Sequence, residues 1–247
     1  MLRAVFISLL TLPLLHSADE FVKPDKLTLH TWVREDMFAG WIGNDTPTLE
    51  RGVKKIDRFL ADHPGDINAL AWKYLASSYY MIRARAKGDD AAYAKHMAEA
   101  KDLRAKIFAG DFQDVGPYII VGSGLINTAC YAPEKERAAM FRDGRQLLAK
   151  VPELQGKLFD DLAPHMRGEL WFELAFASDR LGDTEARDRT LQTIITHLAG
   201  TPYETRAREW QKPGKIAGEK QYNCISCHEP GRLAPTLARI NGTANAR

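Results

Sequence analysis

The chain has 247 residues, 45% of them hydrophobic and 27% charged, which is typical of an ordinary globular protein. Its 34 Lys and Arg nearly balance its 32 Asp and Glu, so the net charge of +2 argues against a nucleic-acid-binding protein. The positive charge is concentrated at one end. From Thr201 onward there are eight Lys or Arg against four Glu, so this end carries +4 and the remainder is slightly acidic.

Residues 1–18 predict a secretory signal peptide. Arg3 gives a positive start, and residues 4–15 form an apolar run that is too short to span a bilayer. Cleavage is expected near Ser17 or Ala18, with an uncleaved anchor as the alternative, because neither site has small residues at both usual positions. No later segment has the length and apolarity of a membrane span. We therefore expect a periplasmic or secreted protein with no membrane span after cleavage.

Residues 19–46 form a lead-in that we expect to be irregular or short-helical. A helix is predicted over residues 47–61, because Asp45 or Thr46 can cap it and Pro47 suits its first turn. Apolar residues recur along one face of this segment at helical spacing: Leu49, Val53, Ile56 and Leu60.

The next predicted helix, residues 67–87, carries a recognisable pattern: Trp72, Leu75, Ala76 and Tyr79. This spacing resembles the first helix of a tetratricopeptide repeat. A second copy begins at Trp171, with Leu174 and Ala175 in place and Ser178 where the Tyr would stand. The two Trp are 99 positions apart (171 − 72), close to three repeats of about 33–34 residues.

The resemblance implies an all-α fold of antiparallel helix pairs, stacked as a solenoid over residues 47–211. A generic helical core, in which these aromatic residues merely pack, is the alternative. The other helices are expected over residues 89–109, 116–129, 134–150, 184–198 and 203–211, with one more after Pro164 capped by Asp160 and Asp161.

Segment 116–129 is unusual because it contains Gly122 and Gly124. We expect a buried helix that packs closely through its glycines, with a strand at residues 118–121 as the alternative. The two glycines flank Ser123 but lack the rest of a dinucleotide-binding fingerprint. Cys130, just beyond, is expected to be a small buried hydrophobic residue.

Residues 212–247 are expected to be a basic link followed by a cofactor-binding tail. Cys224-Ile225-Ser226-Cys227-His228 matches the C-x-x-C-H signature for one covalent c-type haem. Cys224 and Cys227 would form the thioethers, and His228 would be the proximal ligand of the iron. A zinc site, or a disulfide or thioredoxin-like pair, are the alternatives.

The segment after His228 resembles class I cytochromes c, in which a proline precedes a leucine beside the haem. Pro235 stands at the matching place, and the resemblance implies that its carbonyl accepts a hydrogen bond from His228. That family supplies a Met to the other face of the iron from a later helix. The 19 residues after His228 (247 − 228) contain no Met and no His, which departs from the family pattern.

A sixth ligand is therefore expected from the helical body, or else the iron is five-coordinate or its site incomplete. The candidates are Met140, Met166, His96, His165 and His197, with His63 in a turn and His30 in the lead-in. Each has a simpler interpretation, since Met commonly fills a core and a helical His commonly faces water. His165 and Glu169 lie one helical turn apart and are expected to be a surface pair.

These features favour an exported monohaem protein that transfers electrons and docks a redox or other protein partner through its helical body. A protein-binding scaffold, or a haem sensor with an open iron, is the second hypothesis. A catalyst is less favoured, because no acid or base can be assigned over the iron. The haem is expected to lie against the body with one edge exposed beside Lys215, Lys220 and Arg232.

Overall fold

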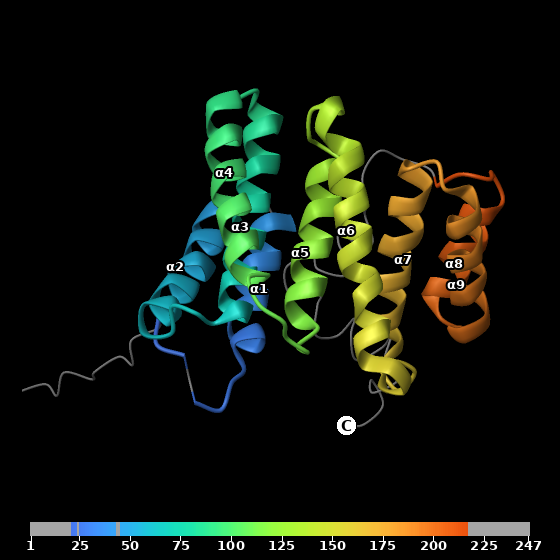
Figure 1. The fold of residues 1–247 in the computed structure, drawn as a ribbon, viewed down its shortest axis with the longest axis horizontal. Helices are drawn as coiled ribbons and strands as arrows, with labels where there is room; N and C mark the ends of the chain where they lie inside the picture. Colours follow the sequence, from blue (N-terminus) through green and yellow to red (C-terminus); the bar gives the residue numbers. More distant parts are fainter. Residues whose placement is uncertain (1–20, 24, 43–44, 217–247) are drawn as a thin grey trace, which may run out of the picture.

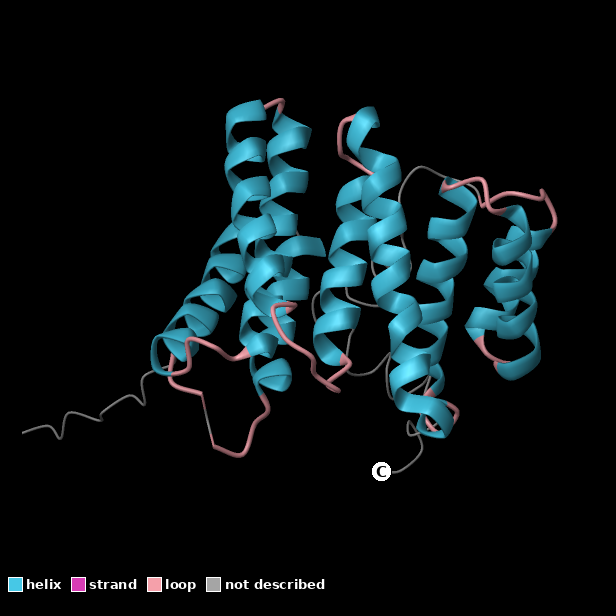
Figure 2. Cartoon of the chain, viewed as in Figure 1, coloured by secondary structure: helices cyan, strands magenta, loops and turns pink. Residues whose placement is uncertain are grey.

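The computed structural model describes residues 21–23, 25–42 and 45–216, and within these ranges the chain is helical without any strand (Figures 1 and 2). The elements are α1 (Leu29–Ile42), α2 (Thr46–Asp62), α3 (Ile67–Lys87), α4 (Asp90–Ile107), α5 (Gly116–Ala129), α6 (Glu134–Gln155), the 3-10 helix η1 (Gly156–Phe159), α7 (Pro164–Arg180), α8 (Thr184–His197) and α9 (Pro202–Gln211). None of the helices in the described ranges has both the length and the apolar character to cross a membrane.

Successive helices pack as pairs: α1 with α2, α3 with α4, α5 with α6, and α7 with α8, while α9 lies against α8 (Figure 1). The first helices of neighbouring pairs also touch, α1 on α3, α3 on α5 and α5 on α7. The expected all-α stack of helix pairs is confirmed.

The repeat length differs from the tetratricopeptide expectation. The last three pairs begin at Ile67, Gly116 and Pro164, so they are spaced by 49 and 48 residues (116 − 67 and 164 − 116). Trp72 and Trp171 are therefore two pairs apart, and the predicted period of about 33–34 residues is wrong. The helices themselves explain the difference, because α3 and α6 have 21 and 22 residues.

Aspartates start four of the helices. Asp45, Asp66, Asp89 and Asp183 each accept a hydrogen bond from a backbone N–H in the first turn, at 3.2, 2.8, 2.8 and 3.1 Å. The expected cap of α7 was wrong, because Ala163 holds the N-cap position without a side-chain bond. The expected end of α6 was also wrong, since this helix continues through Pro152 to Gln155.

Part of the lead-in, expected to be irregular or short-helical, forms helix α1 of 14 residues. Thr28 Oγ1 accepts the backbone N–H of Thr31 at 3.1 Å and so starts it. The buried Asp36 then joins α1 to α2, with Arg51 Nη2 at 2.6 Å and Lys55 Nζ at 2.8 Å from its carboxylate. His30, placed by the sequence in an irregular segment, lies in this helix.

Helix α5 is held close on both sides through glycines, as predicted, and the strand alternative is wrong. A Cβ on Gly124 would lie 2.9 Å from Tyr74 Cε1 on α3. A Cβ on Gly144 of α6 would lie 2.9 Å from the carbonyl oxygen of Gly122. Only residues without a side chain allow the backbones of α5 and α6 to approach this closely.

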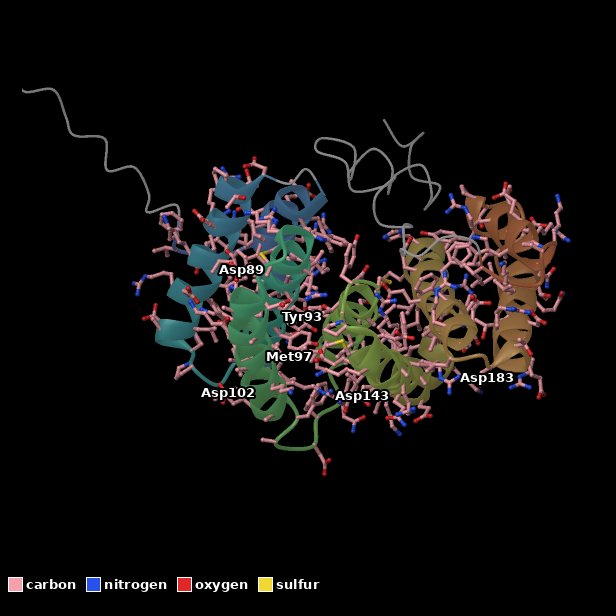
Figure 3. All side chains as sticks on the ribbon, turned by 90° about the horizontal axis from the view of Figure 1, so that it is seen from above. Asp89, Tyr93, Met97, Asp102, Asp143 and Asp183 are labelled. Atoms are coloured by element: carbon pink, nitrogen blue, oxygen red, sulfur yellow. The ribbon has the colours of Figure 1, made fainter. Side chains whose placement is uncertain are left out.

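Polar pairs join the second helices of successive repeats. Arg104 on α4 reaches Asp143 on α6 at 2.7 Å, and Arg145 on α6 reaches Asp183, the cap of α8, at 2.8 Å. Asp143 and Asp183 lie along the lower edge of the stack when it is viewed from above (Figure 3). These bonds join the last three helix pairs along one edge of the stack.

The two pattern tryptophans differ in burial. Trp72 is 1% exposed and packs edge-on against Phe38, with ring centroids 5.9 Å apart. Trp171 is only partly buried, and its ring contacts Phe159 and His197 with centroids 5.5 and 5.8 Å away. Trp72 is thus enclosed between helices, whereas Trp171 is not.

Cys130 follows the last residue of α5 and packs against the core. It is only partly buried, whereas the sequence predicted a buried residue. Its Sγ lies 3.4 Å from the carbonyl oxygen of Ile126, the acceptor for a weak S–H donor.

Candidate functional site

The predicted haem residues, Cys224, Cys227, His228 and Pro235, lie outside the described residues, as do the predicted signal peptide and the basic residues Lys220 and Arg232. What the structure describes is the body to which this segment is attached. The last described residue is Ile216, which is 1% exposed.

An arginine pair anchors the chain just before that segment. The carboxylate of Asp179, near the end of α7, binds Arg180 and Arg187, each at 2.9 Å. Arg180 Nη2 donates to the carbonyl oxygen of Ile216 at 3.3 Å, and Arg187 Nη1 donates to that of Gly214. The chain therefore leaves the described body beside the C-terminal end of α7.

The structure separates the candidates for the sixth ligand. Met140, on α6, is buried in the hydrophobic core, which confirms the interpretation that it fills a gap there. Met166 is 46% exposed. His96 stacks on Tyr80 at 5.0 Å and lies 3.3 Å from Glu99. His63 stacks on a neighbouring ring in the turn after α2, and His30 and His197 are exposed.

His165 belongs to a polar cluster that the sequence did not reveal. Its Nδ1 lies 2.8 Å from the hydroxyl of Tyr203 on α9, and that hydroxyl donates to Glu169 Oε1 at 2.8 Å. The side chains of His165 and Glu169 are only 15% and 20% exposed, so the expected surface pair is wrong.

The direction of these bonds sets the state of the imidazole. Because Tyr203 donates its proton to the Glu169 carboxylate, its oxygen accepts from His165, which places the His165 proton on Nδ1 and the lone pair on Nε2. Tyr203 itself is held by Gly168, where an added Cβ would lie 2.6 Å from the ring.

Burial, and next the positive charge of Arg34 on α1, lower the pKa of His165 to about 4. The ring is therefore neutral at pH 7, which is the form that binds a metal ion. A hydrogen bond from the other ring nitrogen is the usual way in which proteins orient a ligating histidine.

Glu173 extends the same face of α7 by one more turn. It is 4% exposed, and Ser123 Oγ on α5 donates to its Oε2 at 2.5 Å. Burial raises its pKa to about 8, with the nearby charge of Glu169 acting in the same direction. Glu173 is thus a protonated, uncharged acid at pH 7.

In the described ranges, no three His, Cys, Asp or Glu residues come together as a metal site. Any metal bound by His165 would need further ligands from outside these ranges. The sequence held one clue to the cluster, the spacing of His165, Glu169 and Glu173 at successive turns of α7. It held none for Tyr203, which lies 34 residues after Glu169.

No protein-family model matches the chain, and neither a curated protein nor a solved structure matches it.

Proposed function

We propose that the chain is an exported c-type cytochrome-like protein with one covalent haem, and that it transfers electrons. The motif Cys224-Ile225-Ser226-Cys227-His228 carries the proposal, because thiols at this spacing with an adjacent His suit haem attachment. The apolar run of residues 4–15 supports export, which haem attachment of this type requires. The helical body would dock the partner, as stacked helix pairs commonly do.

In this proposal the haem supplies one-electron chemistry and the protein residues hold and tune it. Cys224 and Cys227 would bind the porphyrin edge, and His228 would bind the iron. Pro235 would orient His228 through its carbonyl oxygen.

The decisive experiment is export together with a c-type haem maturation system, followed by haem staining of a denaturing gel. We expect one stained band, which disappears in the double variant Cys224→Ser/Cys227→Ser. Cys130→Ser is the matched control and should keep the band, since Cys130 packs against the core at the end of α5. Protein that stays unstained but carries one zinc per chain would contradict the proposal.

Electron transfer is tested by the rate at which an acidic small redox protein reduces the haem over a salt series. The rate should fall with salt, and fall again when Lys215, Lys220 and Arg232 become Glu, because the Debye length is only about 8 Å at physiological ionic strength. Lys101→Glu, an exposed change on α4, is the control. A salt-independent rate with tight carbon monoxide binding would instead favour a sensor or an enzyme.

A further inference from the structure

A buried carboxyl group lies in the contact between the pair α5–α6 and the pair α7–α8. Glu173 of α7 is 4% exposed, and its Oε2 accepts the hydroxyl of Ser123 on α5 at 2.5 Å. The contact between α5 and α7 is much smaller than the contact between α3 and α5. One buried polar bond therefore has a large influence on whether α5 and α7 stay together.

The groups around this carboxyl offer no positive charge to compensate it. Within the described ranges its hydrogen-bond partner is Ser123, and the charged group that acts on it is Glu169, one turn away on α7. The titratable groups of the neighbouring elements act elsewhere: Arg34 of α1 on His165, Arg145 of α6 on Asp183, Arg187 of α8 on Asp179, and Tyr203 of α9 on Glu169. An ionised Glu173 would be a buried charge beside a like charge, which is strongly unfavourable.

A second connection across the same junction does not involve Glu173. Arg145 of α6 lies 2.8 Å from the carboxylate of Asp183 and 3.3 Å from Ser178 Oγ. The hydrogen bond from Arg145 holds the pKa of Asp183 below its usual range, so this pair stays ionised at neutral and alkaline pH. The rings of Phe141 on α6 and Phe176 on α7 also pack edge-on, 6.0 Å apart. The contact of α6 with α7 and α8 can therefore persist while α5 and α7 separate.

We propose that Glu173 and Ser123 form a pH-sensitive latch between α5 and α7, which is closed while Glu173 holds its proton and opens when that proton is lost. On opening, the ionised carboxylate gains water, and the pair of Arg145 with Asp183 keeps α8 bound to α6. The latch goes beyond the proposed electron transfer and does not depend on it.

The direction of the pH dependence follows from the proton affinity of the closed form. Burial raises the pKa of Glu173 from an ordinary value of 4.5 to about 8 in the folded chain, whereas a hydrated carboxyl in the open form titrates near the ordinary value. The closed latch is therefore most stable below pH 4.5, and the opening equilibrium constant rises about tenfold per pH unit until about pH 8, where it levels off.

Amide hydrogen exchange of the full chain, corrected for the intrinsic effect of pH on exchange, measures this opening. Protection of the amides in α5 and α7 should fall about tenfold per unit between pH 5 and pH 8, whereas protection in α1 and α2 should change little. Glu173→Gln should abolish the fall, because it keeps an acceptor for Ser123 without a titratable group. Ser123→Ala keeps the carboxyl but removes the bond, so protection should be lower at each pH and should still fall.

Glu185→Gln is the matched control, since Glu185 is an exposed carboxylate on α8 of the same helix pair. Its exchange should match that of the unaltered chain at every pH. A fall in protection that persists in Glu173→Gln would overturn the latch. An equal fall in α1 and α2 would also overturn it, because the whole stack would then be unfolding together.

Discussion

Trp72 and Trp171 occupy similar places in α3 and α7, yet only Trp72 is enclosed. We expect Trp72→Ala to lower the free energy of unfolding by about 3–5 kcal/mol, the usual cost of removing a large buried ring. Trp171→Ala should cost clearly less, about 1–2 kcal/mol, because solvent already reaches that ring. Urea unfolding of both variants measures the difference, and equal costs would contradict the observed burial.

Glu173 should make stability depend on pH. Its pKa is about 8 in the folded chain against an ordinary value of 4.5, so the folded state binds the extra proton. The stability that this proton provides is complete below pH 4.5 and is lost as the pH rises through about 8. Glu173→Gln has no such loss, and its advantage should grow between pH 5 and pH 8, reaching the order of 3 kcal/mol near pH 7.

The measurement is urea unfolding of the two proteins at several pH values. Gln keeps an acceptor for the Ser123 hydroxyl, which makes it the closest uncharged replacement. A difference in unfolding free energy that is the same at pH 5 and pH 8 would show that Glu173 stays ionised.

At this scale the sequence predicted the pairing of His165 with Glu169 but not its burial. Periodicity can show that two residues share a helix face, but the element that covers this face comes from elsewhere in the chain. Here it is α9, whose Tyr203 packs on Gly168. The proposed haem motif is the opposite case, because its prediction depends only on adjacent residues and their spacing.

Among the elements, the contact between α5 and α6 depends on a glycine in each helix. A Cβ on Gly144 would lie 2.8 Å from Ile126 Cγ1 and 2.9 Å from the backbone oxygen of Gly122. We expect Gly144→Ala to destabilise the protein, because overpacking costs about 1–3 kcal/mol and the gain in helix propensity only about 1 kcal/mol.

Gly65→Ala provides the control, since no atom lies within 4 Å of the added Cβ. It should be neutral or slightly stabilising in thermal unfolding. A stabilised Gly144→Ala variant would mean that α5 and α6 can separate at little cost.

Helix positions were predictable because aspartate caps and apolar spacing are local signals. The spacing between helix pairs was not predictable, because it depends on how far each helix continues beyond its local sequence signals. Pro152 illustrates this point. A proline normally ends a helix, but α6 continues to Gln155, with Val151 buried beside the proline.

In the whole molecule, each helix pair is supported mainly by its neighbours, so cooperative unfolding need not involve the entire stack at once. The terminal unit, α8 with α9, has support on one side within the described ranges, and local opening there would release the Arg187 and Arg180 anchors of Gly214 and Ile216.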